Sequence, residues 1–251
     1  MHIALTGAAP ISTGILEFFR TIGIPLVEVY GQTESTGVAT AQPLDDVHLG
    51  TVGEAVSGVD VKLGEHNEII MRGGSMFKGY YKNDEATAST LKDGWLHTGD
   101  VGEWRDGQLK IVDRLKDIMI TAGGKNLSPT EIENTIKASP YIKECIVIGE
   151  ARKYVSALIQ IDFDTVAKWA EQERIAYTTF RSLTEQERVN ELIQNEVNRG
   201  NEQLPQVAQI KRFHLLTKEL DHDDDEVTAT MKVRRSNIYE KYTDVIESLY
   251  A

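Results

Sequence analysis

The residues with the clearest chemical potential lie in two short loops near the start of the chain. The first loop is Gly7-Ala8-Ala9, whose small side chains let a ligand approach the backbone closely. The second loop, residues 30–34, reads Tyr-Gly-Gln-Thr-Glu. The hydroxyl of Thr33 can donate to a phosphate oxygen, and the carboxylate of Glu34 can ligate Mg²⁺. Either loop alone would more often be an ordinary turn, so a phosphate site depends on their occurring together.

The pattern around these loops predicts a strand, a helix and a second strand that runs parallel to the first. Ile3–Leu5 and Leu26–Tyr30 have the length and composition of short buried strands. Helical spacing runs between them from about residue 12 to residue 22, and Gly23 is placed to end that helix. We expect its buried face to consist of Ile15, Leu16, Phe18, Phe19 and Ile22. Because loops at the carboxyl ends of parallel strands share one edge of a sheet, the two small-residue loops should lie together.

A small antiparallel barrel or sheet is predicted between residues 50 and 113. Segments of alternating polarity, such as Val59–Leu63 and Glu68–Met71, are separated there by glycine-rich turns. The stretch Gly94-Trp95-Leu96-His97-Thr98-Gly99-Asp100 lies within this region. By itself, its Asp100 would most simply belong to a surface turn, and we expect His97 to be a packing residue rather than a base.

A separate α+β domain is predicted in the second half of the chain. A short strand around Ile118–Ile120 is followed by Gly123-Gly124, which can turn the chain back on itself. A helix should begin next, because Ser128 is a good N-cap and Pro129 suits the first helical position. Glu131 lies three residues beyond the cap and completes a capping box.

The rest of this domain alternates strand-like and helical stretches. Strands are expected at Ile142–Gly149, Tyr154–Ile161 and Ile210–Leu216. Helices are expected at Asp164–Glu173, Thr184–Glu202 and Arg235–Leu249. Thr184 and Glu187 have the spacing of a second capping box. Lys232 falls in the loop before the last helix, where a long side chain could reach a ligand.

Composition and charge limit the classes of protein to which the chain can belong. Apolar residues make up 41% of its 251 residues, which is ordinary for a globular protein. The net charge of −12 gives little electrostatic support for nucleic-acid binding. Cys145 is the only cysteine, which favours a reducing compartment. No signal-peptide pattern occurs at the start, and no apolar run approaches the roughly 18 residues that span a bilayer. We therefore expect a cytoplasmic protein without a transmembrane segment.

Four motifs, in their order along the chain, resemble those of the adenylate-forming superfamily of acyl-CoA synthetases, luciferases and adenylation domains. They are Tyr-Gly-Gln-Thr-Glu at 30–34, Gly-Trp-Leu-His-Thr-Gly-Asp at 94–100, Asp-Arg-Leu-Lys-Asp at 113–117 and Thr-Ala-Thr-Met-Lys-Val-Arg-Arg at 228–235. The third motif looks most like that of the long-chain fatty acyl-CoA synthetases. The fourth has Met231 where many members have glycine, which long-chain synthetases often lack.

The resemblance implies a nucleotide site. The residues implied to bind the nucleotide are Gly7, Ala8, Ala9, Tyr30, Gly31, Thr33, Asp100 and Arg114. Tyr30 would pack against adenine, and Asp100 would accept hydrogen bonds from both ribose hydroxyls, as a carboxylate can. Arg114 would hold the same ribose. Thr33 would bind the α-phosphate, and Glu34 would be the ligand of Mg²⁺.

The resemblance also implies a catalytic lysine, a hinge and a CoA-side turn, which would act at successive stages of the reaction. Lys232 would be the catalytic lysine, together with Thr33 and Glu34 in the catalytic set. Lys116 would be the hinge of a domain rotation, and Gly123-Gly124 would leave space for the pantetheine arm of CoA. Arg234 and Lys241 are the next candidates if Lys232 is not the catalytic lysine.

The implied fold combines α/β and α+β parts. Residues 1–115 would be the end of a large AMP-binding domain, with a strand–helix–strand piece at 1–35 and the barrel at 50–113. Residues 116–251 would form a small mobile lid domain. The chain contains no phosphate loop of the Thr-Ser-Gly-Thr-Thr-Gly type. We therefore expect it to be the carboxyl-terminal part of a longer enzyme, with little or no ligase activity alone.

The implied activity is the ATP-dependent conversion of a long-chain fatty acid to an acyl-adenylate, followed by transfer to CoA. ATP/AMP and Mg²⁺ would be required, and CoA would be a substrate. Two alternatives stay open: a ligase for another carboxylic acid or thiol acceptor, and a nucleotide-binding fragment without catalysis. Peripheral membrane association and a homodimer are also left open.

Overall fold

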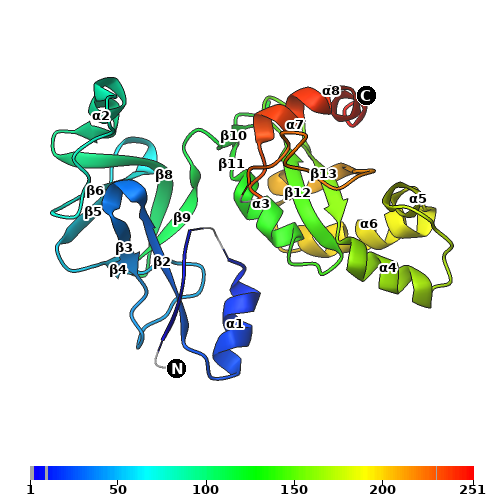
Figure 1. Ribbon diagram of the computed structural model, residues 1–251, viewed down its shortest axis with the longest axis horizontal. Coiled ribbons are helices and arrows are strands. Elements are labelled where there is room, and N and C mark those ends of the chain that lie inside the picture. Colours follow the sequence, from blue (N-terminus) through cyan, green and yellow to red (C-terminus); the bar gives the residue numbers. More distant parts are fainter. Residues whose placement is uncertain (1–2, 9–10, 230) are drawn as a thin grey trace. The chain divides into compact units, whose positions relative to one another are not determined.

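The computed structural model describes residues 3–8, 11–229 and 231–251. The chain divides into two compact units, Met1–Ile118 and Met119–Ala251, each with its own hydrophobic core. Figure 1 shows the helices and strands of each unit. Within the described ranges, no helix has both the length and the apolar character needed to cross a bilayer.

The first sheet of unit 1 contains the predicted strand–helix–strand. Its strands, in spatial order, are β1 (Ala4–Thr6), β2 (Leu26–Gln32), β3 (Gly37–Ala41) and β4 (Glu54–Ala55). β1 and β2 are parallel, with Ala4 opposite Leu26, and α1 (Thr13–Thr21) connects them. This arrangement confirms the prediction. β2 and β3 are antiparallel, and the turn between them carries Thr33 and Glu34.

Helix α1 buries less of its apolar surface than the sequence predicts. Of the five residues expected to form its buried face, only Leu16 is fully buried, and Phe19 is half-buried. Ile15, Phe18 and Ile22 are exposed, and their spacing of three and four residues places them on one side of the helix. The prediction was wrong for these three, because periodicity identifies an apolar side of a helix but not what covers it.

The second sheet of unit 1 is antiparallel throughout. Its strands are β5 (Val59–Leu63), β6 (Glu68–Gly73), β7 (Leu91–Lys92), β8 (Trp95–Arg105) and β9 (Gln108–Arg114), and α2 (Asp84–Thr90) precedes β7. The order is β5-β6-β8-β7, and β9 pairs with β8. Ile69, Met71, Leu96 and Leu109 are completely buried in its core. The antiparallel architecture predicted for this region is confirmed, and β8 contains Asp100.

Unit 2 begins with the predicted hairpin and helix. β10 (Met119–Ile120) and β11 (Asn126–Leu127) are antiparallel, and α3 (Pro129–Ile136) follows them. The Ser128 hydroxyl oxygen accepts a hydrogen bond from the N–H of Glu131 at 3.1 Å, which satisfies one free donor of the first helical turn.

A three-stranded sheet between two layers of helices forms the rest of unit 2. Its strands are β12 (Ile142–Ile148), β13 (Val155–Ile161) and β14 (Ile210–Leu215), in that order. The helices are α4 (Phe163–Gln172), α5 (Phe180–Thr184), α6 (Glu187–Asn201), α7 (Arg235–Lys241) and α8 (Thr243–Ser248). Every residue of β13 is buried, because α3 to α6 cover one face of the sheet and α7 and α8 cover the other (Figure 1).

Two helix boundaries in unit 2 differ from the prediction. α6 begins at Glu187 after Gln186, so the expected capping box at Thr184 is wrong. Thr184 instead ends α5, a short helix that Thr179 caps. The final helix is interrupted at Tyr242, which separates α7 from α8. Cys145 is buried in β12.

Candidate active site

Asp100 is the centre of a hydrogen-bonded group contributed by three strands of unit 1. The side chain of Asp100 is only 9% exposed. Oδ2 accepts hydrogen bonds from the Tyr30 hydroxyl at 2.6 Å and from Gln32 Nε2 at 3.0 Å. Oδ1 lies 3.4 Å from Nε of Arg114, which stands opposite Asp100 in the β8–β9 register. Strand pairing therefore brings Arg114 to Asp100, whereas Tyr30 and Gln32 reach the same carboxylate through their side chains from β2, which belongs to the other sheet of unit 1.

Tyr30 is a structural partner of Asp100 as well as a candidate ligand contact. The side chain is buried in the core of unit 1. Burial and the neighbouring Asp100 carboxylate both raise the pKa of Tyr30, so the phenol remains protonated and donates to Asp100. The guanidinium of Arg114, in contrast, is half exposed and can reach a ligand.

The turn after Tyr30 depends on a glycine. A Cβ at Gly31 would lie 1.7 Å from the carbonyl oxygen of Gly37, so only glycine allows β2 and the start of β3 to approach this closely. Thr33–Ser35 form a short 3₁₀ helix, η1. The Gln32 N–H donates to the Ser35 hydroxyl at 2.9 Å, which fixes the first residue of that turn. Thr33 is exposed at its start.

Glu34 lies in the same turn, and a tyrosine hydroxyl orients its carboxylate. Its Oε1 accepts a hydrogen bond from the Tyr80 hydroxyl at 2.6 Å, and this bond raises the pKa of Tyr80. The structure shows no cluster of three or more His, Cys, Asp or Glu residues suited to a metal in the ranges it describes. A single carboxylate fits Mg²⁺, which is usually held by one or two carboxylates together with substrate phosphates.

The other small-residue loop lies beside β2. A Cβ at Gly7 would come within 2.9 Å of the carbonyl oxygen of Val29, so this loop passes close to the strand that carries Tyr30. Ala8 has a left-handed backbone conformation, with φ 69°. Ala9, the third predicted residue of the loop, lies outside the described residues.

Sequence reasoning missed several residues that hold this site. Gln32 bonds Asp100, and its Nε2 also donates to the Thr98 carbonyl at 3.0 Å. Glu68 of β6 supports the same part of β8, since its two carboxylate oxygens bond His97 Nδ1 at 2.7 Å and the N–H of Gly99 at 2.9 Å. His97 is therefore a hydrogen-bond partner of Glu68 in β8. No local pattern could have shown these contacts, because their partners are separated by 29 to 68 residues.

The predicted hinge and CoA-side residues lie in exposed turns. Lys116 follows β9 in a turn closed by a bond from the Asp117 N–H to the Arg114 carbonyl at 2.9 Å. The Gly124 N–H donates to the Thr121 carbonyl at 2.8 Å in the β10–β11 turn. Nothing in the described structure lies within 4 Å of a Cβ added at Gly124, and Gly123 would meet only Thr121 at 3.9 Å.

Lys232 lies in a narrow loop of unit 2. Val227 and Val233 bridge the ends of that loop. The Thr228 N–H donates to the Lys232 carbonyl at 2.8 Å, and the Lys232 N–H donates to the Thr228 hydroxyl at 3.0 Å. Met231 has a φ of 61°, a conformation that favours glycine, which explains physically why glycine suits this position. The Lys232 residue itself is exposed.

A fully buried carboxylate fixes the base of this loop. Glu226 Oε1 accepts from Lys241 at 2.8 Å and from the Tyr242 hydroxyl at 3.0 Å. Its Oε2 accepts from Lys218 at 2.9 Å and from the Asp221 N–H at 3.0 Å. Burial alone would raise the pKa of Glu226, but the two lysines outweigh it and lower the pKa below its ordinary value. Lys241, a reserve candidate for catalysis, is thus engaged at the base of the loop.

A second buried ion pair joins α3 to α7. Arg235 donates to both oxygens of Glu133, at 2.6 Å each. Glu133 is 6% exposed and also accepts from the Val147 N–H at 2.8 Å. The pair connects the helix after the Gly123-Gly124 hairpin with the helix after the Lys232 loop.

Comparison with known protein families follows the same division of the chain. A model of the AMP-binding enzyme C-terminal domain matches residues 116–251, and a model of the AMP-binding enzyme matches residues 1–81. The chain belongs to the AMP-binding enzyme family. Its members fadD11 and FadD15 of Mycobacterium tuberculosis, both named as fatty-acid–CoA ligases, are 43% and 33% identical over 99% and 98% of this chain. A mouse long-chain-fatty-acid–CoA ligase is 34% identical over the whole chain.

The chain spans less than half the length of these relatives, namely 44% of fadD11 and 42% of FadD15. Solved structures with the same fold also match this chain over less than half of their own length. The adenylation domain of a carboxylate reductase from Mycobacterium chelonae matches 98% of this chain and 38% of its own length, with a TM-score of 0.76 at 23% identity. An O-succinylbenzoate–CoA synthetase from Bacillus subtilis, solved with ATP and magnesium, matches 92% of this chain and 45% of its own, with a TM-score of 0.70 at 23% identity.

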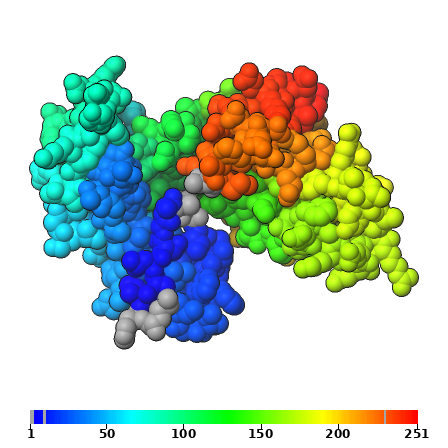
Figure 2. Space-filling view, viewed as in Figure 1, coloured from blue at the N-terminus to red at the C-terminus, as the bar shows by residue number. Residues whose placement is uncertain are grey.

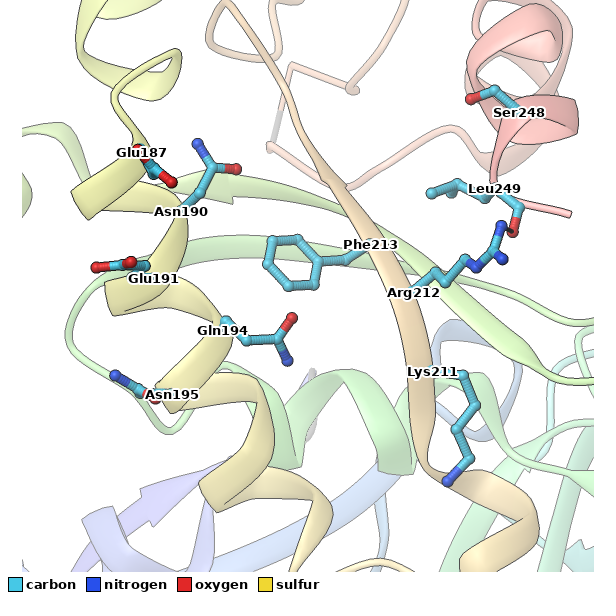
Figure 3. Close-up of a pocket in the computed structure, with 10 residues that line it drawn as sticks. All are labelled: Glu187, Asn190, Glu191, Gln194, Asn195, Lys211, Arg212, Phe213, Ser248 and Leu249. Carbon is cyan, nitrogen blue, oxygen red and sulfur yellow. Dashed lines mark hydrogen bonds between the residues drawn. The ribbon is translucent and has the colours of Figure 1, made fainter. Parts of the chain in front are cut away.

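This AMP-binding family chain also has a pocket away from the motif residues. Figure 3 shows it between α6, β14 and the end of α8, with Phe213 pointing toward Asn190 and Gln194 of α6. The pocket has a volume of about 660 Å³. None of the residues predicted for the nucleotide, Mg²⁺ or CoA lines it.

Proposed function

We propose that residues 1–251 supply the ribose-binding, metal-binding and lid residues of an AMP-forming ligase that joins a long-chain fatty acid to CoA. The observation that carries the proposal is the group around Asp100, in which Tyr30, Gln32 and Arg114 lie within 3.4 Å of one buried carboxylate. The family membership and the fatty-acid–CoA ligase names of the relatives support the choice of reaction.

Asp100 and Arg114 would hold the nucleotide through its ribose. Tyr30 and Gln32 both donate to Oδ2, which leaves Oδ1 facing the half-exposed guanidinium of Arg114. A ribose hydroxyl that donates to this oxygen gains a charge-assisted bond worth about 1.5–3 kcal/mol. The buried donors keep the carboxylate fixed before the ligand arrives, so little of that free energy is lost in ordering it.

Thr33 and Glu34 would face the phosphates from the adjoining turn. The Thr33 hydroxyl would donate to an oxygen of the α-phosphate, and Glu34, oriented by Tyr80, would hold Mg²⁺. Mg²⁺ bound there would neutralise phosphate charge and orient the pyrophosphate leaving group. Glu34 would therefore position charge, without exchanging a proton with the substrate.

Lys232 would act in the first step only. The fatty carboxylate attacks the α-phosphorus of ATP, an acyl-adenylate forms and pyrophosphate leaves. The ammonium of Lys232 would bridge the carboxylate and phosphate oxygens, where negative charge grows in the transition state. After rotation about Lys116, the Gly123-Gly124 hairpin would admit the CoA thiol. The CoA sulfur, having released its proton to solvent, then forms a bond to the acyl carbon, and the bond from that carbon to the phosphate oxygen breaks so that AMP leaves.

The experiment joins this chain to the part of FadD15 that has no counterpart in it. A chimaera in which residues 1–251 replace the aligned region of FadD15 should form AMP and acyl-CoA from ATP, CoA and a long-chain acid, while residues 1–251 alone should form almost none. Aryl and medium-chain acids test the alternative substrate. A folded chimaera that binds AMP but forms no adenylate from any of these acids would favour a nucleotide-binding protein without catalysis.

A further inference from the structure

The loop that carries Lys232 is attached to the body of unit 2 through its two ends. The hydrogen bonds of the Lys232 backbone that the structure describes both go to Thr228, on the other side of the same narrow loop. Lys232 is exposed, and Figure 2 shows this orange part of the chain at the surface. Because these two bonds lie within the loop, they fix its shape but not its place on unit 2. That place is set by the residues at which the loop begins and ends.

Glu226 anchors the beginning of the loop. It is completely buried, and its oxygens accept from Lys218 at 2.9 Å and from Lys241 at 2.8 Å. The Tyr242 hydroxyl, between α7 and α8, donates to the same carboxylate at 3.0 Å. The Glu226 carbonyl accepts the N–H of Arg234, at the end of the loop, at 2.9 Å. One residue therefore ties both ends of the loop to the junction of α7 and α8.

Asp225 strengthens the attachment at the end of the loop. Its Oδ1 accepts from the Arg234 guanidinium at 2.8 Å, and its carbonyl accepts from Asn237 Nδ2 in α7 at 2.9 Å. We name the carboxylates of Asp225 and Glu226 the carboxylate clamp. The clamp joins both ends of the Lys232 loop to unit 2 through side chains of the last two helices and of Lys218.

Such a network is better suited to fixing a position than to adding stability. Taking charges out of water costs free energy that the ion pairs return only in part, so a buried network often contributes little stability on balance. Its bonds are directional, however, and several donors on one buried carboxylate leave it a single orientation. Position matters greatly for a reacting group, since a displacement of about 1 Å can lower a rate by about 10².

We propose that the carboxylate clamp positions Lys232 for adenylate formation, and that Glu226 is the principal positioning residue. This inference rests on the proposed function, in which Lys232 acts in the first step only. Glu226 would not contact the substrate, because it is buried and acts through the backbone of the loop. Loosening the clamp should therefore slow the first half-reaction and spare the second, whereas a general loss of stability in unit 2 would impair both.

Glu226→Gln removes the negative charge and keeps the size of the side chain. In the chimaera with FadD15, it should lower kcat for pyrophosphate release about tenfold or more and change the KM for ATP little, because geometry rather than affinity is altered. AMP release from synthetic acyl-adenylate and CoA should be nearly unchanged. Glu196→Gln is the matched control, since Glu196 is another buried carboxylate of unit 2, ion-paired with Arg199 within α6. It should leave the ratio of the two half-reactions as it is in the parent.

Hydrogen exchange in residues 1–251 tests the clamp without substrates. In Glu226→Gln, the amides of Thr228 and Lys232 should exchange about tenfold faster, while the amides of β13 keep their protection and show that unit 2 is folded. Tyr242→Phe covers the case in which Glu226→Gln does not fold, because it removes one donor to Glu226 and no charge. Its effects on exchange and on the half-reactions should be smaller and in the same direction.

The outcomes separate this proposal from the proposed function. Unchanged exchange of the Thr228 and Lys232 amides in a folded variant of the clamp would overturn it. So would a Glu226→Gln chimaera whose two half-reactions keep the ratio of the parent, although Lys232→Ala slows only the first. If Lys232→Ala impairs both half-reactions alike, the error lies in the proposed function, and the role of the clamp in adenylation is refuted with it.

Discussion

The ion pair between Glu133 and Arg235 permits a quantitative prediction, since both partners and their surroundings are defined. Arg235→Met keeps most of the side-chain volume but removes two bonds of 2.6 Å to the carboxylate of Glu133, whose side chain is 8% exposed. Breaking a buried pair on one side costs about 3–5 kcal/mol, because a buried charge is left without its partner. The Val147 N–H still bonds Glu133 at 2.8 Å. We therefore expect a loss near the lower end, about 3 kcal/mol.

The loss should depend on pH, with a defined sign. Burial raises the pKa of Glu133, and the Arg235 guanidinium opposes that rise. Without Arg235 the pKa rises further, so over a wider pH range the folded protein holds a proton that the unfolded chain has released. Stability then falls as pH rises through that range. The loss of stability caused by Arg235→Met should be largest at neutral pH. It should be smaller in mild acid, where Glu133 is protonated and its burial costs less.

Hydrogen exchange of the β13 amides in increasing urea would measure this free energy for unit 2 alone. Arg181→Met is the control, because its pair with Glu185 is exposed on both sides and its loss should change the stability little. Adding Glu133→Gln to Arg235→Met should recover part of the loss by removing the unpaired charge. The prediction is wrong if Arg235→Met changes the stability of unit 2 no more than Arg181→Met does, or if the loss of stability in Arg235→Met becomes larger in acid.

Three further predictions concern single positions. Burial raises the pKa of Glu28 from 4.5 to about 7, so unit 1 should lose stability as pH rises between these values. Urea titrations at several pH values should show that Glu28→Gln abolishes this pH dependence. A pH dependence that survives in Glu28→Gln would refute the prediction. Met231→Gly should stabilise unit 2 by about 0.5–1 kcal/mol by relieving the positive φ, whereas Met231→Val should destabilise it, and equal exchange rates in both variants would exclude backbone strain there. Lys116→Pro in the chimaera with FadD15 should impair adenylation and thioester formation to different extents, and equal losses in the two half-reaction assays would argue against a hinge.

Local features of the fold were predictable because they depend on neighbouring residues. The Gly123-Gly124 turn, the Ser128 cap and the buried strand β13 are all encoded within a few positions of the chain. The predicted helix cap at Thr184 was wrong even though it depends only on neighbouring residues. Thr184 ends α5 instead, and its hydroxyl donates to the Arg181 carbonyl at 2.9 Å within that helix, so it does not cap α6.

Contacts between distant residues could not be predicted from the residues alone. Tyr30 and Asp100 are 70 positions apart, and Glu133 and Arg235 are 102 positions apart. Motif resemblance named Asp100 and Arg114, but it could not show that Gln32 would share Asp100. The predicted burial of the outer side of α1 was wrong for another reason, since an apolar pattern does not reveal whether other residues cover that side.

The most direct test of the central claim separates the two half-reactions at Lys232. In the chimaera with FadD15, Lys232→Ala should reduce pyrophosphate release from ATP and a long-chain acid by about 10²–10³, the loss typical of one preorganised donor. AMP release from synthetic acyl-adenylate and CoA should be nearly unchanged, because Lys232 would act only while the adenylate forms. Parallel loss of both half-reactions, in a variant whose Tm matches that of the parent, would contradict the assignment of Lys232 and of the ligase mechanism built on it.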